Sequence, residues 1–280
     1  MTRLRTAALF VWRNKLLTLA IVLLAIVTVL AVFAPLFAAF EPGAMRIARR
    51  LRPPSDVHLF GTDEFGRDVF ARVIHGGRIS LAAGGLTVLF ACAGGVVLGI
   101  LAGFYDRADR VIGKVVDGMM AFPDILLAIA LVAVLGPSLT NVVVALGVVY
   151  MPRVARVVRA STLVIRELPF VEAARALGVP THRILSRHVL RNLASPLIVQ
   201  GTFIFAYAIL AEAGLSFLGV GVSPETPTWG NMINAGQQYA RQAWWIMMFP
   251  GVAIVICVFS LQIIGDALRD ALDPKLRRTV

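Results

Sequence analysis

The ionisable side chains of this sequence do not fall into the arrangements that enzymes use to break bonds. The four histidines lie outside the long apolar runs, and neither an HExxH zinc motif nor a GxSxG nucleophile motif occurs. A phosphate-binding GxxxxGK[ST] loop is also missing, because Val115 follows Gly113 and Lys114. Neither Cys92 nor Cys257 has a second cysteine at metal-ligand spacing. We therefore expect no catalytic residue, no metal site and no cofactor bound by this chain.

Three carboxylates lie within or beside the apolar segments. Glu212 is the single charge in the run from Pro196 to Val222, and a charge inside a membrane is costly unless it is paired or hydrated. We interpret Glu212 as a gating or pathway residue, or as a partner for another helix of the same bundle. Asp117 and Asp124 are candidates for the same roles, although both also fit positions near a helix start, where the helix dipole favours an acid.

A further charged set precedes the second long apolar run. Asp63, Arg67 and Asp68 are close enough in sequence to form a network of ion pairs. Such a network would either brace the segment 41–78 or receive a partner protein, and a solvated loop explains the same charges equally well.

The stretch from Leu168 to Pro180 carries the strongest local signals for a short helix. Pro169 suits a first helical position, Gly178 suits a left-handed residue just past a helix end, and Pro180 prevents continuation. These signals predict a helix over residues 169–177, with Glu172 in its first turn. The spacing i, i+3, i+4, i+7 predicts one apolar face made by Phe170, Ala173, Ala174 and Leu177.

This predicted helix must dock on something. Isolated helices need about 12–15 residues to be even marginally stable in water. The spacing leaves two docking surfaces open: the inner ends of the chain's own membrane helices, or a groove on a partner protein.

Composition shows which elements must position these residues. The chain has 280 residues, of which 58% are hydrophobic and 15% are charged, and its mean hydropathy is +0.81. Soluble domains carry about 25% charged residues, so a soluble enzyme is excluded. The formal charge of +11 does not indicate nucleic-acid binding, because the bases lie between apolar runs and not on one face of a soluble domain.

The apolar runs predict an all-α integral membrane protein with six transmembrane helices, at roughly 20 residues for each crossing. Two runs near Gly136-Pro137-Ser138 form either a hairpin of two spans, from about Val111 to about Val158, or one interrupted span. Gly95, Gly99 and Gly103 recur every four residues and predict a close helix–helix contact. The other predicted spans are Leu16–Phe40, Ile79–Tyr105, Pro196–Val222 and Gln242–Gly265, with Trp244 and Trp245 at an interface.

Lysine and arginine counts predict the orientation. With six spans and both termini cytoplasmic, 19 of the 27 bases fall on the inner side, eight of them in residues 151–192. Five spans with the N-terminus outside give the same count, but would place a basic, acid-free N-terminus outside. The predicted organisation is therefore as follows: residues 1–40, a cytoplasmic N-terminus and first span; 41–78, an outer loop; 79–265, a five-helix core with an inner loop at 159–192; and 266–280, a cytoplasmic tail.

Four separated motifs, in order, resemble one family. Glu172-Ala173-Ala174 with Gly178 resembles the EAA loop of permease subunits of ATP-binding-cassette importers. The other three look like the C-type subunit of the dipeptide/oligopeptide/nickel branch: His58–Asp68 with Gly77–Leu81, Glu212–Gly221 with Pro227–Gly230, and Gly265–Pro274. One residue departs from the pattern, because Arg191 stands where the family commonly has proline, which puts the exit geometry of the EAA loop in question.

The resemblance implies a type I importer fold with six spans and a cytoplasmic EAA loop in a bacterial inner membrane. It implies a second homologous permease subunit, two ATPase subunits that hold ATP and Mg²⁺, an extracytoplasmic binding protein, and a surrounding of membrane lipid. The coupling residues would be Phe170, Glu172, Ala173, Ala174, Leu177 and Gly178, and Asp63, Arg67, Asp68 and Trp229 would lie at the outer loop or contact the binding protein.

The motifs indicate the branch of the family more directly than they indicate the transported solute. Di- or oligopeptide is the expectation, and glutathione or a nickel chelate would fit the same branch. Functions of two other classes are the alternatives. A membrane-embedded enzyme would need catalytic motifs that this sequence lacks, and a stand-alone channel or ion-driven transporter would be favoured by inverted repeats that it does not display.

Overall fold

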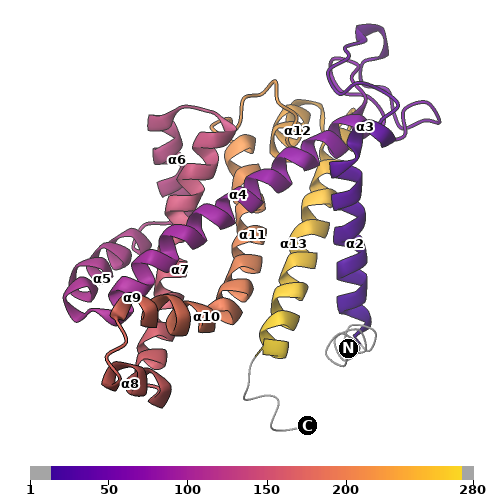
Figure 1. Ribbon diagram of the computed structural model, residues 1–280. Helices are drawn as coiled ribbons and strands as arrows, with labels where there is room; N and C mark the ends of the chain where they lie inside the picture. The colour runs from indigo at the N-terminus through magenta and orange to yellow at the C-terminus, as the bar shows by residue number, and fades with distance from the viewer. Residues whose placement is uncertain (1–13, 273–280) are drawn as a thin grey trace.

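The computed structural model describes residues 14–272, and within this range the chain folds into helices and forms no β-strand. Five helices are long and apolar enough to cross a membrane. They are α2 (Lys15–Val32), α4 (Val69–Phe104), α7 (Leu139–Arg166), α11 (Ala194–Phe217) and α13 (Trp245–Leu272). Figure 1 shows α4 running obliquely across the others. The all-α membrane fold is confirmed, whereas the predicted roles of residues 1–13 and 273–280 lie outside the described residues.

The sixth predicted span is a bent pair of helices. α5 (Asp106–Met120) and α6 (Asp124–Leu135) meet at an angle of 95°. With 12 residues, α6 is about 18 Å long, which is short of the roughly 30 Å hydrocarbon core. The predicted turn at residues 136–138 does separate α6 from α7. The straight first arm of the predicted hairpin is wrong, because Pro123 breaks the helix next to that bend.

The helix α4 begins earlier than its apolar run predicts. It starts at Val69 instead of Ile79 and spans 36 residues. The Asp68 side chain caps it by accepting a hydrogen bond from the Ala71 backbone N–H at 2.8 Å. Periodicity in the apolar run could not reveal this polar first part, because Arg72 is held there by Asp63 and the Pro42 carbonyl of the preceding segment.

Shorter helices connect the long ones on both sides of the bundle. On one side lie α3 (Ala34–Phe37), η1 (Ile47–Arg49), α12 (Trp229–Gly236) and η3 (Gln237–Tyr239). At the opposite end of the bundle lie α8 (Pro169–Ala176), α9 (Thr181–Ile184), the π-helical turn η2 (Leu185–Val189) and α10 (Leu190–Asn192). Figure 1 shows these two groups at opposite ends of α7 and α11.

The predicted glycine stripe forms the contact between α4 and α7. Cβ atoms added at Gly95, Gly99 and Gly103 would lie 2.5, 2.5 and 2.6 Å from the Cβ atoms of Val154, Val158 and Thr162, respectively. The missing side chains let the two backbones approach closely where lipid gives no hydrophobic drive for association. The stripe is therefore a packing device, as its spacing predicts.

Two apolar cores divide the bundle. One joins the middle of α4 to α6, α7 and α11, and it includes Val171 and Ala174 of α8. The other joins the start of α4 to α2, α12 and α13. The short helix α8 is therefore an extension of the first core and not a separate module.

Substitution at Gly99 tests the close contact. We expect Gly99→Ala to destabilise the chain by about 1–3 kcal/mol, because its Cβ would overlap Val158 and the Ala155 carbonyl. Gly85→Ala is the matched control on the same helix, because nothing lies within 4 Å of its added Cβ. The readout is the temperature at which half of the detergent-solubilised chain aggregates. Equal temperatures for the two variants would contradict the packing role of the stripe.

Candidate functional site

The helix α8 is built by the local signals that the sequence carries. Leu168 is extended, Pro169 opens the helix, and Glu172 lies in the first turn. Gly178 has a φ of +72°, in the left-handed region that favours glycine. The helix ends at Ala176, one residue before the predicted end.

The buried face of α8 differs from the predicted one. Val171 is fully buried and Ala174 is 8% exposed, and both pack on the chain's own core. In contrast, Phe170 is 43% and Leu177 is 83% exposed. The prediction of a single apolar face is therefore wrong, because i, i+3 spacing also links Val171 to Ala174. The residues that the prediction joined are split between the two surfaces.

The remaining apolar residues form what we call the α8 stripe, defined as Phe170, Ala173 and Leu177, all exposed. Helical spacing of three and four residues places them side by side. The structure thus shows α8 docked on its own chain, and the α8 stripe has no cover within residues 14–272.

The loop after α8 leads back into the bundle without a sharp exit. α9, η2 and α10 follow one another and end where α11 begins. Arg191 lies in α10 and is exposed. The Phe170 ring lies 5.8 Å from the His188 ring, and the Arg175 guanidinium lies 5.0 Å from the ring centre of Phe104 at the end of α4. These contacts hold α8 against both the loop and α4.

A ladder of ion pairs joins α7 to the bent pair α5–α6. Arg159 donates two hydrogen bonds to Asp109, at 2.5 and 2.6 Å, and Arg166 contacts Asp106 at 3.2 Å. The other rungs are Arg153 with Asp124, and Arg156 with Asp117 at 2.7 Å. All four arginines are on α7, so the bent pair is tied to the helix that leads into α8.

The two predicted aspartates lie at different places on their helices, and both pair with arginines of α7. Asp124 is the first residue of α6, as expected for an acid near a helix start. Asp117 lies in the last turn of α5 instead, so its predicted place near a helix start is wrong. Asp117 is exposed at that position, and its carboxylate pairs with Arg156 of α7.

Glu212 pairs within the bundle. It is fully buried on α11. The Ser216 hydroxyl donates to one carboxylate oxygen at 2.9 Å, and the Ser80 hydroxyl of α4 donates to the other at 3.0 Å. Because the Trp229 backbone N–H in turn donates to Ser80 at 3.4 Å, the carboxylate links α11, α4 and α12.

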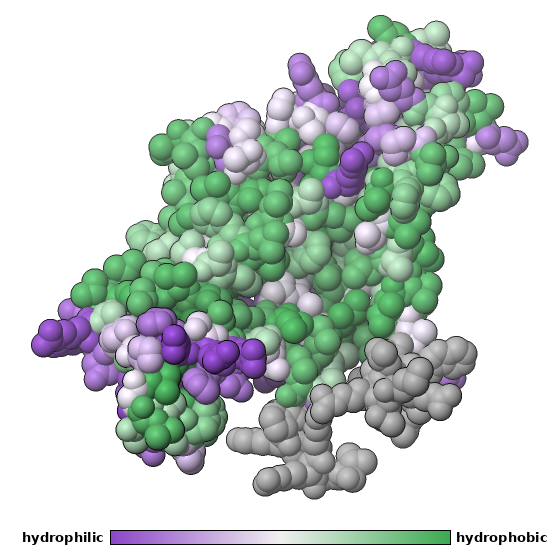
Figure 2. All heavy atoms as spheres, viewed as in Figure 1, coloured by the Kyte–Doolittle hydropathy of each residue, from purple (hydrophilic) through white to green (hydrophobic). Residues whose placement is uncertain are grey.

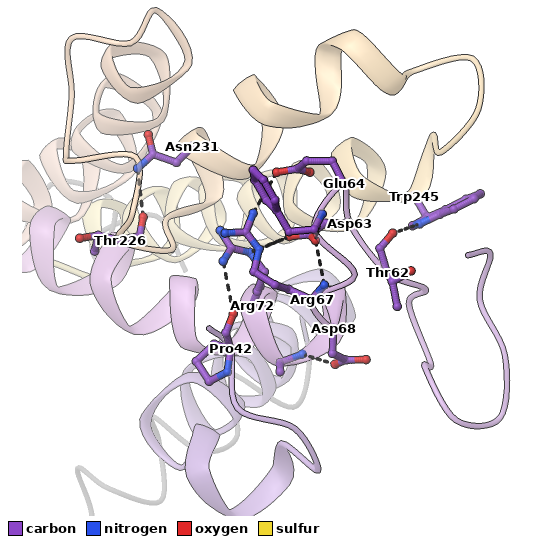
Figure 3. Close-up of polar contacts among 12 residues, drawn as sticks. Pro42, Thr62, Asp63, Glu64, Arg67, Asp68, Arg72, Thr226, Asn231 and Trp245 are labelled. Atoms are coloured by element: carbon purple, nitrogen blue, oxygen red, sulfur yellow. Dashed lines mark hydrogen bonds and ion pairs between the residues drawn. The ribbon is translucent and has the colours of Figure 1, made fainter. Parts of the chain in front are cut away.

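Charged residues of the segment 41–78 form a buried network around Asp63 (Figure 3). The Arg67 Nε donates to the Asp63 carboxylate at 2.5 Å, and Arg72 of α4 lies 3.6 Å from the same carboxylate. Asp68, besides capping α4, lies 2.9 Å from the Nδ1 atom of His58. The exposure of Asp63, Arg67 and Asp68 is 8% or less. Their side chains brace the loop on the end of α4.

Two tryptophans lock the same end of the molecule. The indole N–H of Trp229 donates to the Val73 carbonyl at 2.9 Å, and Trp229 is 1% exposed. Trp245 donates to the Thr62 carbonyl at 3.0 Å (Figure 3) and is also buried, whereas Trp244 is 50% exposed. The interfacial position predicted for both tryptophans thus fits the exposure of Trp244 alone. The local sequence around Trp245 did not predict its hydrogen bond to the Thr62 carbonyl.

Comparison with known proteins connects this architecture to a family. Residues 95–278 match the family model described as the binding-protein-dependent transport system inner membrane component. A protein of Brucella abortus biovar 1, named as a candidate peptide transport system permease, is 48% identical over 95% of this chain and 90% of its own length. The dipeptide transport system permease protein DppC of Alkalihalophilus pseudofirmus is 43% identical over 95% of this chain and 88% of its own.

A solved structure shares the fold. A chain of the MetNI methionine ABC transporter in an inward-facing conformation has a TM-score of 0.58 and 22% sequence identity, and the match covers 72% of this chain and 96% of that one. Together with the 48% identity to the Brucella relative, this agreement confirms the resemblance that the EAA motif suggests. The chain belongs to the family of binding-protein-dependent transport system inner membrane components, which are non-catalytic permease subunits of ATP-binding-cassette transporters.

Proposed function

We propose that this chain forms half of the translocation pathway of a peptide importer, and that α8 is the surface through which an ATPase subunit acts on it. The observation that carries the proposal is the divided surface of α8. One side is anchored in the chain's own core, and the α8 stripe is exposed. An anchored helix with a free apolar stripe can transmit a push from a partner's groove to the bundle.

The proposed assembly contains a second homologous permease subunit, two ATPase subunits and an extracytoplasmic binding protein. ATP and Mg²⁺ would be held by the ATPases. Closure of the ATPases on ATP would bring the two α8 helices together, and the spans would tilt from inward- to outward-facing. Glu172, in the first turn of α8, and Gly178, which ends it, would fix the orientation of the α8 stripe.

The proposed orientation places both termini and the segment 159–192 in the cytoplasm of a bacterium, with the segment 41–78 and α12 outside. The count of bases supports this orientation. Because the network around Asp63 is buried, binding-protein contacts would be made by the exposed residues that the network holds in place. Asp117, Asp124 and Glu212 would set the packing of the helices that gate the path, since each is already paired.

Charge addition on α8 tests the coupling role. Leu177→Asp should lower transport and copurification of the ATPase by about tenfold or more, because it places a charge in an apolar contact. Thr181→Asp is the matched control, since it adds the same charge at an exposed position outside the α8 stripe. Glu172→Arg should also weaken copurification. Normal transport by Leu177→Asp with the ATPase bound at its native ratio would exclude coupling through this stripe.

Thiol labelling tests the orientation. In a chain with Cys92 and Cys257 replaced by alanine, Glu225→Cys should react with a membrane-impermeant maleimide added to intact cells. Thr181→Cys should react only after the membrane is opened. Both positions are exposed in the structure, so failure to react reports sidedness and not burial. The reverse pattern would invert the proposed topology.

Peptide is the proposed solute, because the relatives named for peptide and dipeptide transport are 43% to 48% identical to this chain. Glutathione is the second candidate, since a glutathione transport system permease of Pectobacterium atrosepticum is 44% identical over 80% of this chain.

Competition against uptake of a labelled dipeptide distinguishes these solutes. Unlabelled dipeptides should compete at lower concentration than glutathione, and the opposite order would favour glutathione. Glu212→Gln should keep the same order, because both oxygens of the native carboxylate are occupied by serine hydroxyls. A changed order in that variant would place Glu212 in contact with the solute.

A further inference from the structure

Three basic residues of α5 form no ion pair within residues 14–272, whereas all three acidic residues of that helix pair with arginines. Asp106, Asp109 and Asp117 all face arginines of α7. The bases are exposed and form no ion pair with any residue of the described range 14–272: Arg107, Arg110 and Lys114. Their spacing of i, i+3 and i+7 places them on one side of the helix. We call them the α5 bases.

An exposed apolar strip lies next to the α5 bases. Val111 and Val115 are 65% and 57% exposed. Val111 directly follows Arg110, and Val115 directly follows Lys114. The helix α5 thus has an acidic side that pairs with its own bundle, a basic side, and an apolar strip next to the basic side. This is the pattern of a helix that lies along a membrane surface.

The place of α5 in the molecule fits this pattern. In Figure 1, α5 lies at the level of the loop that contains α8, α9 and α10, beside the end of α4. Figure 2 shows hydrophilic residues gathered at the same corner, directly beneath the broad apolar surface. The α5 bases therefore lie where the apolar surface gives way to the polar end of the molecule.

A cavity of about 360 Å³ lies between α5, α4 and α7 beside these bases. Arg110 and Lys114 line it together with Asp109 and Asp117. The two aspartates are neutralised by Arg159 and Arg156, which line the same cavity. Two positive charges are thus left over in a cavity whose remaining lining includes Ala102, Ile112 and Val116.

We propose that α5 binds an anionic phospholipid, with the phosphodiester held by Arg110 and Lys114 at the cavity, Arg107 adding attraction, and the acyl chains along Val111 and Val115. Basic pockets between membrane helices favour anionic headgroups, and each base near the surface adds to the attraction. The position of α5 beside the broad apolar surface favours a lipid over an acidic protein partner, which would leave α5 without lipid labels. The orientation proposed above assigns this lipid to the cytoplasmic leaflet, but binding itself does not depend on that orientation.

Cross-linking to a photoreactive phosphatidylglycerol tests the proposal. The probe is present in trace amount in phosphatidylethanolamine vesicles that hold the assembled importer, and mass spectrometry locates the cross-links. We expect labelling within residues 106–120, with unlabelled phosphatidylglycerol competing about fivefold or more better than extra phosphatidylethanolamine. The advantage of phosphatidylglycerol over phosphatidylethanolamine as a competitor should become smaller as the salt concentration is raised. Equal competition by the two lipids, or an α5 without labels in the assembled importer, would overturn the proposal.

Substitutions of the α5 bases test whether their positive charge is needed for lipid binding. Arg107→Gln/Arg110→Gln/Lys114→Gln should lose at least about fivefold of the α5 labelling, and Arg107→Lys/Arg110→Lys should keep it. The matched control, Arg50→Gln/Arg52→Gln/Arg241→Gln, removes three exposed bases that form no ion pair with described residues, and should label as the native chain does. Unchanged labelling in the α5 triple variant would refute the site. Because labelling is read without transport, its failure is distinct from a failure of α8 coupling.

Discussion

The close approach of α4 and α7 is the constraint on which the rest of the structure depends. Three glycines of α4 lie against Val154, Val158 and Thr162, at distances that leave no room for a side chain. In a membrane, where burial of apolar surface does not drive helices together, such contacts supply the packing energy. The charged rungs that tie α5 and α6 to α7 and the anchoring of α8 on the same core both follow from where α7 is held.

This arrangement explains how a helix of only eight residues can serve as a coupling element. Two residues separate Arg166, the end of α7, from Pro169, the start of α8. Val171 and Ala174 then fix α8 to the core, while Phe170 and Leu177 remain exposed. In the proposed mechanism, a force applied to the α8 stripe would therefore be delivered to α7 and α4 together. At the other end of α4, the network around Asp63 and the hydrogen bonds of Glu212 hold the segment 41–68, α11 and α12 on the same helix.

Much of this organisation could be predicted from sequence, and the failures have physical causes. Gly178 and Pro169 predicted α8 because local backbone preferences decide helix ends. The glycine spacing predicted the α4 contact for a different reason, since small residues on one face of a helix let a neighbouring backbone approach closely. The buried face of α8 was predicted wrongly because Phe170 and Val171 are both apolar, and only the position of the core distinguishes them. Likewise, the pairing of Asp117 with Arg156 links residues that are 39 positions apart, which no local pattern reveals.

In the proposed importer, α8 moves as one body with α4 and α7 when ATP binds. Spin labels at Ala176→Cys, which is exposed on α8 outside the α8 stripe, and Leu89→Cys on α4, in a chain without its two native cysteines, measure this directly in the assembled importer. We predict that the distance within the chain changes by less than about 2 Å on ATP binding, while the distance between α8 and the corresponding helix of the second permease subunit shortens. A change within the chain as large as the change between subunits would contradict the account.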